Sequence, residues 1–308
     1  MVVGKILLWL LLATHLSIGA MDLGYHAVKG INTEMHLMRP AAETNADAVA
    51  QPLLGLSFVP VAIGLLASLI GPAGLRRSVA KSAALVGAGV HLAMLLPVYL
   101  YPEVWVAEHL HPNMTVEMIV VFRSVFAGFC LLLFITTPAD TEPAGERSIA
   151  GMFMYVFAAK LFFLHATAFY FELVSTAPPF LRLSGVPAQA PYLYGELMVQ
   201  NLVAVSHFPG AFAMVLALCQ LIPLRDAAFI SGATQLAWAA SIRAELSILN
   251  LFIDDARAIS PDNLIVIHSA LGVLCFIIYI ALIFTATPPG PALIPRTNKK
   301  EEKQIKQE

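Results

Sequence analysis

Apolar residues gather into eight long segments, and short polar pieces separate them. The segments cover roughly residues 4–24, 52–71, 83–101, 115–137, 151–175, 197–221, 227–250 and 263–287. Each is close to the ~20 residues that an α-helix needs to cross the hydrocarbon core of a bilayer. Helix-breaking prolines such as Pro72, Pro102 and Pro138 lie between them. The pattern predicts an all-α polytopic membrane protein with eight transmembrane helices.

Residues of the first half recur 149 or 150 positions later. Examples are Ser57 and Ser206, Pro60 and Pro209, Pro112 and Pro261, and His15 and His165. A near-constant offset indicates a tandem duplication. We therefore expect a first four-helix repeat at 1–138, a linker at 139–150 and a second four-helix repeat at 151–290. A disordered, charged cytoplasmic tail is expected at 291–308.

A histidine and a carboxylate occur seven residues apart in two of the apolar segments. These pairs are His15 with Asp22 and His165 with Glu172. Seven residues is about two helical turns, so each pair lies on one helix face, about 10 Å apart. A charge at the centre of a membrane helix costs roughly 2.5–3.5 kcal/mol on insertion scales. Such groups are therefore expected to face a cavity or one another.

Composition agrees with the membrane class. The chain is 58% hydrophobic and 12% charged, whereas soluble domains carry about twice that charge. A net charge of −2 gives no sign of a nucleic-acid partner. Cys130, Cys219 and Cys275 all lie in apolar segments, so buried free thiols are expected and not disulfides. The chain has no CxxC or His-rich spacing, and we predict neither a metal nor a cofactor.

The placement of Lys and Arg predicts the orientation. Of the 18 basic residues, eleven lie on the N-terminal side of the expected bundle and four on the other. The remaining three, Arg123, Lys160 and Arg243, lie inside apolar segments. Because basic residues favour the cytoplasmic side, both termini should be cytoplasmic, with the endoplasmic reticulum as the expected membrane. The first segment also fits a signal peptide, but its His15–Asp22 pair leads us to expect a retained helix.

The second repeat carries more polar groups within its apolar segments than the first, so we place the working site there. The candidate catalytic residues are Glu172, His165 and His207. The candidate substrate-binding residues are Glu196, Asn201, Arg243, Glu245, His268, Asp22 and His15. The alternative is that these groups pair between helices and fix the bundle. For Glu196, solvation at the membrane surface is an equal alternative, and for His91 a hydrogen-bonded core histidine is the better interpretation.

Three short motifs resemble the emopamil-binding/sigma-2 receptor superfamily (EXPERA domain). Met21-Asp22-Leu23 following a histidine resembles the first helix of that family, and Glu196-Leu197-Met198-Val199-Gln200 resembles the opening of its second helix. Val90-His91 with Pro97 is similar to its Val-His run ending in proline. The resemblance implies a four-helix membrane fold shared by sterol isomerases and by sterol- or drug-binding proteins. It also implies that Glu196 lines a ligand cavity.

The resemblance further implies proton transfer to and from a lipid-soluble sterol, terpenoid or polyketide-like substrate. A buried carboxyl can donate a proton at neutral pH and a neighbouring histidine can relay it. Glu172 is then the general acid and His165 the relay, and Trp238 is a candidate for stabilising positive charge. Isomerisation, cyclisation and epoxide opening stay open, as does a non-catalytic sterol- or lipid-binding role. An ion-coupled transporter is a further alternative.

Overall fold

The structure is a computed structural model that describes residues 2–27, 45–70, 73–95, 98, 115–137, 194–243 and 261–285. This part of the chain forms seven α-helices and no strand. They are α1 (Val2–Ala27), α3 (Asn45–Ile70), α4 (Ala73–Ala93), α7 (Val116–Thr136), α10 (Tyr194–Leu218), α11 (Leu224–Arg243) and α13 (Pro261–Thr285). The predicted all-α fold is confirmed for these residues.

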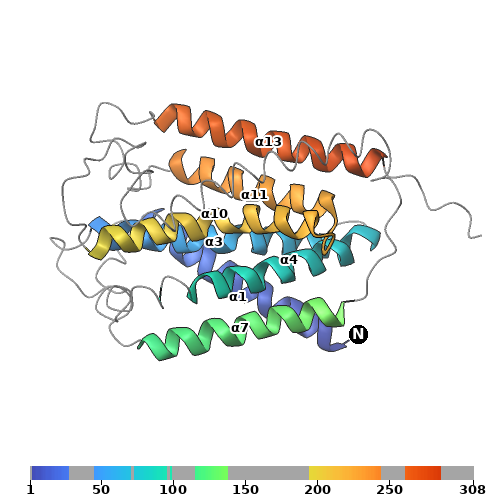
Figure 1. Cartoon of the computed structure of the whole chain (residues 1–308), viewed down its shortest axis with the longest axis horizontal. Helices are drawn as coiled ribbons and strands as arrows, with labels where there is room; N and C mark the ends of the chain where they lie inside the picture. Colours follow the sequence, from blue (N-terminus) through green and yellow to red (C-terminus); the bar gives the residue numbers. More distant parts are fainter. Residues whose placement is uncertain are drawn as a thin grey trace, which may run out of the picture.

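The helices run side by side along the long axis of the molecule (Figure 1). Four of them form the middle of the bundle, because α3 and α4 each contact both α10 and α11. The other three flank this group: α1 packs on α3 and α7, α7 packs on α4, and α13 packs on α11. The N-terminal end of α1 and the C-terminal end of α13 lie at the same end of the bundle (Figure 1).

Seven of the eight predicted segments correspond to a helix. The fifth, at 151–175, lies outside the described residues, as do the linker at 139–150 and the tail at 291–308. The third apolar segment, which starts near residue 83, belongs to a longer helix, because α4 begins at Ala73. Hydropathy detects only the apolar part of a helix. The first part of α4 is polar and contains Arg76, Arg77 and Lys81.

Local signals explain the bounds of α7. Thr115 is its N-cap, and its hydroxyl accepts a hydrogen bond from the Met118 N–H at 3.3 Å. Glu117 in the first turn adds a favourable charge at the positive end of the helix dipole. At the other end, the Thr137 N–H donates to the Leu133 carbonyl at 3.0 Å, and Pro138 follows. Pro138 offers no N–H to continue the helix.

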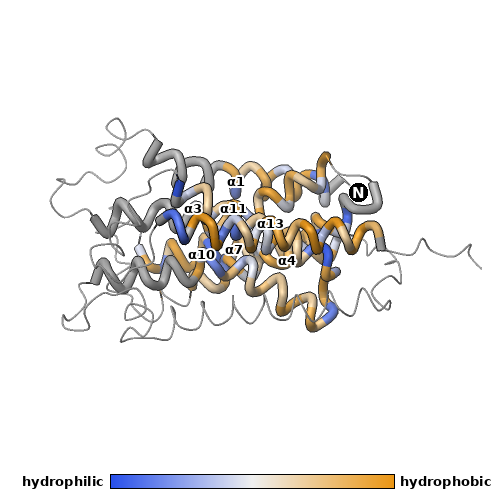
Figure 2. The backbone as a smooth tube through the Cα atoms, turned by 90° about the horizontal axis from the view of Figure 1, so that it is seen from above, coloured by the Kyte–Doolittle hydropathy of each residue, from blue (hydrophilic) through white to orange (hydrophobic). Residues whose placement is uncertain are grey.

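Two of the described helices are long and apolar enough to cross a membrane: α7, over Val116–Thr136, and α13, over Ile265–Phe284. Only 17% and 22% of the residues in their most apolar windows are buried. Apolar colours dominate the tube of the described helices (Figure 2). Ile135 is 75% exposed and Phe284 is 83% exposed. These outer helices therefore direct apolar side chains outward, away from the bundle.

Small residues allow the helices to approach closely. A Cβ added at Gly64 of α3 would lie 2.8 Å from the Ala83 Cβ of α4. A Cβ added at Gly232 of α11 would lie 2.9 Å from Phe276 Cε2 of α13. Small side chains at a helix interface let the two backbones approach closely and pack tightly.

Helix bounds recur at the offset found in the sequence. The starts of α3 and α10, at Asn45 and Tyr194, are 149 residues apart, and so are the ends of α7 and α13, at Thr136 and Thr285. The contacts between the two halves are also reciprocal, because α3 contacts α11 and α4 contacts α10. Such reciprocal contacts are typical of two-fold-related packing. The repeat boundaries at 138 and 151 lie outside the described residues and stay predictions.

The turn between α10 and α11 contains a left-handed residue. Gln220 has φ 59°, where glycine is usual. The Leu221 N–H donates to the Leu216 carbonyl at 2.8 Å, and the Gln220 N–H donates to the Ala217 carbonyl at 2.9 Å. These two bonds form a Schellman motif. The turn therefore holds a non-glycine residue in a conformation that costs it energy.

Candidate functional site

Two predicted site residues, His207 and His268, meet around Trp238. His207 comes from α10, Trp238 from α11 and His268 from α13. The rings of His207 and Trp238 are stacked with centroids 4.5 Å apart, and the rings of Trp238 and His268 are stacked at 5.6 Å. The two imidazoles are 5.9 Å apart. Three helices of the second half thus bring two titratable rings against one aromatic face.

A hydrogen bond orients one of these imidazoles. His268 Nδ1 lies 2.6 Å from Gln235 Oε1, and Gln235 is buried one turn before Trp238 on α11. With the amide oxygen as acceptor, Nδ1 carries the proton and Nε2 becomes the acceptor atom of the neutral ring. A base held in one tautomer by a third group is a recurrent element of acid–base sites.

His207 lies against an aromatic ring. Its side chain is buried, and its ring lies nearly parallel to the Trp238 indole, at an interplanar angle of 21°. An indole face can also attract a cation. The cluster therefore places a second titratable ring beside the imidazole that Gln235 orients.

The side chains of most other predicted site residues lie outside what the structure describes. His165, Glu172 and Glu245 lie outside the described residues. Asp22 lies on α1, and Glu196 and Asn201 lie on α10, but the structure does not describe their side chains. Arg243 is the last residue of α11 and is exposed, so it is not buried with the two histidines. The predicted grouping of acids with histidines stays a prediction.

The structure places His15 in the other half of the molecule. Its ring contacts Phe58 of α3 at 5.5 Å and His91 of α4 at 5.2 Å. His91 was expected to be a hydrogen-bonded core histidine. It is fully buried, but neither of its ring nitrogens has a hydrogen-bond partner, so that expectation is wrong. His15 and His91 form a cluster of their own, separate from the contacts around Trp238.

The thiols were predicted to be free and buried. Cys130 and Cys275 are free and buried, which agrees with the prediction, but Cys219 is exposed. Cys219 follows the last residue of α10 and lies in the turn before α11. Its apolar neighbours in sequence therefore do not enclose it, and for this thiol the prediction was wrong.

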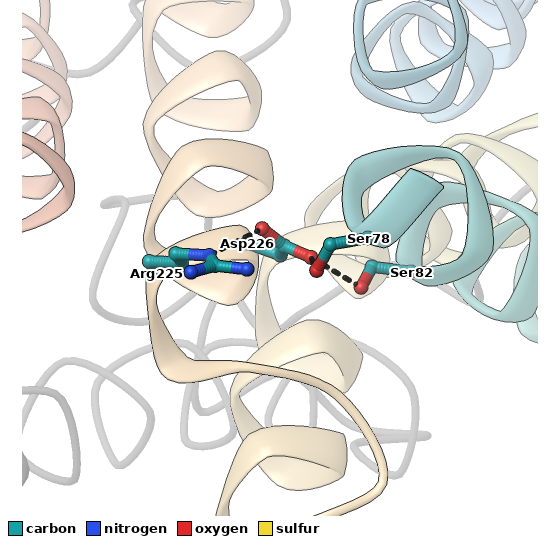
Figure 3. Close-up of polar contacts among 4 residues, drawn as sticks. All are labelled: Ser78, Ser82, Arg225 and Asp226. Carbon is teal, nitrogen blue, oxygen red and sulfur yellow. Dashed lines mark hydrogen bonds and ion pairs between the residues drawn. The ribbon is translucent and has the colours of Figure 1, made fainter. Parts of the chain in front are cut away.

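A third polar cluster joins the two halves, and the sequence reasoning missed it. The hydroxyls of Ser78 and Ser82 on α4 donate to one carboxylate oxygen of Asp226 on α11, at 2.6 and 2.7 Å (Figure 3). Arg225 Nε lies 3.6 Å from the other oxygen. Asp226 has no exposed surface. The available signal was the four-residue spacing of the serines, which places them on one helix face.

Comparison with protein-family models, curated proteins and solved structures found no match. The chemistry of the chain therefore rests on the described contacts.

Proposed function

We propose that the chain is an integral membrane enzyme that moves protons on a lipid-soluble substrate. The first support is the distribution of polarity. α7 and α13 expose apolar side chains such as Val266 and Ile277, whereas His15, His91, His207 and Asp226 are buried. Exposed apolar surface of this extent marks contact with a membrane or a partner. Charged and titratable groups enclosed by such helices are typical of membrane sites that act on a substrate or ion.

The His207–Trp238–His268 cluster is the observation that carries the enzymatic proposal. Protonated His207 donates the first proton, Trp238 stabilises the positive charge that develops, and neutral His268 removes a proton through Nε2. The number of protons balances over these steps, since one proton enters the substrate and one leaves it. It fits isomerisation and cyclisation of an alkene. The same proton donation opens an epoxide, so the hydrolase alternative remains part of the proposal.

Further residues named from the sequence belong to this proposal. Glu172 and His165 remain proposed as a general acid and relay, and Glu196, Asn201, Arg243 and Glu245 as residues that bind the substrate. A sterol, terpenoid or polyketide-like molecule is the proposed substrate class, because only an apolar ligand would partition into this bundle. The endoplasmic reticulum and cytoplasmic termini are proposed with it.

Non-catalytic sterol or lipid binding is the second candidate function. The observation that favours it is the stacking of Trp238 with His207 and with His268, at centroid distances of 4.5 and 5.6 Å. A rigid aromatic layer is also suited to holding a flat ligand without converting it.

Lipid and metabolite profiling of a deletion strain separates the two functions. We expect one compound to accumulate and a product to disappear, and both changes should be reversed by the wild-type chain but not by His207→Gln. Glutamine keeps the approximate size and polarity of the site but cannot titrate. Reversal by the variant as complete as by the wild type would show that His207 transfers no proton. An unchanged profile in the deletion strain would favour the binding function.

A further inference from the structure

The histidines of the first half lie beside a thiol. His15 of α1, His91 of α4 and Cys130 of α7 each offer one ligand atom, and these three atoms lie within 4.8 Å of one another. All three side chains are fully buried. Around a trigonal metal ion, with bonds of about 2.0–2.1 Å to nitrogen and about 2.3 Å to sulfur, ligand atoms lie about 3.5–3.8 Å apart. Shifts of about 1 Å would therefore close the site.

The protonation of His15 prepares one nitrogen for a metal. Its Nδ1 lies 2.7 Å from the Leu11 carbonyl oxygen, which can only accept, so Nδ1 carries the proton. Nε2 is then the unprotonated atom, and it is buried without a hydrogen-bond partner. Metal-binding histidines commonly use one ring nitrogen to donate to a carbonyl while the other binds the ion.

His91 lacks hydrogen bonds more completely than His15 does. Neither ring nitrogen has a hydrogen-bond partner, and the ring has no exposed surface. A buried polar group without a partner is costly, so it requires an explanation. Contacts with the Phe58 and Phe126 rings pack the imidazole but satisfy neither nitrogen. A metal ion would satisfy one of them.

Gly87 lets the backbone of α4 lie close to these ligands. It lies on α4, one turn before His91. A Cβ at this position would stand 3.0 Å from Val61 Cγ1, 3.2 Å from Cys130 Sγ and 3.6 Å from His15 Nε2. The sulfur and the nitrogen thus face the same small volume, which an alanine side chain would occupy.

Charge decides which ion fits. The guanidinium of Arg123 is nearby, since it lies 4.9 Å from the centre of the Phe58 ring that also contacts both histidines. A divalent ion with one thiolate would leave a net positive charge buried beside Arg123, which is costly away from water. A monovalent copper ion with one thiolate and two neutral imidazoles gives a neutral site. Thiolate ligands also select Cu(I).

We propose that His15, His91 and Cys130 form a three-coordinate Cu(I) site within the first half of the bundle. Binding replaces the thiol proton of Cys130 with the metal, so one proton is released for each ion bound. The oxidation state of copper does not change. The site is independent of the proton-transfer chemistry proposed around Trp238.

Copper titration of the purified full-length protein tests the proposal. A Cys219→Ser background removes the exposed thiol, and ascorbate keeps Cu(I) reduced while bicinchoninate competes for it. We expect one Cu(I) per chain, with one sulfur and two nitrogen neighbours in the X-ray absorption spectrum. Cys130→Ser should weaken binding by at least about 100-fold, since loss of even an outer-shell partner costs 10–100-fold. Cys275→Ser, which changes the buried thiol of α13, should bind as the background does.

A pair of glycine substitutions tests the close packing at Gly87 while all three ligands are kept. Gly87→Ala should weaken Cu(I) binding, whereas Gly128→Ala on α7 should not, because a Cβ there meets nothing within 4 Å. Circular dichroism of each variant checks that the helices are intact. The proposal is overturned if the background protein binds no Cu(I), if Cys130→Ser and Cys275→Ser bind equally, or if Zn²⁺ binds at these residues and Cu(I) does not.

Discussion

Removing the serine hydroxyls that bind Asp226 should destabilise the contact between the two halves of the bundle. Ser78 and Ser82 both donate to the same oxygen of Asp226 (Figure 3). The perturbation is Ser78→Ala, Ser82→Ala and the double variant. Each change deletes one donor and leaves the helix backbone as it is, because alanine is the best helix former.

The structure sets the size of the effect. The donor–acceptor distances are 2.6 and 2.7 Å, and Asp226 is fully buried, so water cannot replace the lost hydroxyls. A hydrogen bond to a charged group contributes about 1.5–3 kcal/mol net. We therefore expect each single variant to lower the free energy of unfolding by about 1.5–3 kcal/mol, and the double variant by more than either.

Unfolding in mixed micelles with increasing SDS, followed by circular dichroism, measures these differences. Ser231→Ala is the matched control, since Ser231 is a buried serine whose hydroxyl donates to the neutral Gly210 carbonyl at 3.1 Å. Its loss should cost only about 0.5–1.5 kcal/mol. In an Asp226→Asn background the carboxylate is absent, so Ser82→Ala should cost about as little as the control. If the double variant unfolds like Ser231→Ala, the hydroxyls do not stabilise a charged Asp226.

Three further predictions follow from particular positions. Gly64→Ala should lower the free energy of unfolding by about 1–3 kcal/mol, because its Cβ would lie 2.8 Å from the Ala83 Cβ. Gly128→Ala should be neutral or stabilising. Equal unfolding midpoints for the two variants would contradict the close approach of α3 and α4. Gln220→Gly should raise the free energy of unfolding by up to about 1 kcal/mol, since glycine adopts a φ of 59° without strain. A lower unfolding midpoint for this variant would argue against the left-handed turn. A reagent confined to the cytosol should label Lys300→Cys and not Glu108→Cys; the opposite labelling would reverse the predicted orientation.

Hydropathy predicted the helices because apolar character and helix length are properties of continuous segments. It missed the first part of α4, where Arg76, Arg77 and Lys81 lie on a helix that extends past its apolar stretch. His207 and His268 were named as site residues because a polar group in an apolar segment is costly wherever it lies. Their contact through Trp238 depends on how α10, α11 and α13 pack, which the sequence pattern does not contain.

The two other clusters depend wholly on tertiary packing. His15, His91 and Cys130 are separated by 76 and 39 residues, so no local spacing rule for metal ligands connects them. Asp226 follows Arg225 in the short polar piece between two predicted apolar segments, so hydropathy alone did not single it out. Helix α11 begins at Leu224, however, and turns the carboxylate toward the serines of α4. Both clusters became visible only when helices from distant parts of the chain were placed side by side.

The most direct test of the proposed proton transfer uses membranes that contain the protein. Such membranes would be incubated with a lipid extract of the deletion strain in D₂O enriched in ¹⁸O, and the products analysed by mass spectrometry. We predict that one lipid-soluble compound disappears and one product forms with the wild-type chain, and that the rate falls by about 10²-fold or more with His207→Gln. Deuterium on carbon would indicate alkene protonation, ¹⁸O would indicate epoxide hydrolysis, and a product with neither label would indicate cyclisation by epoxide opening. Conversion at equal rates by both proteins, or no conversion by the wild-type chain, would contradict the proposal.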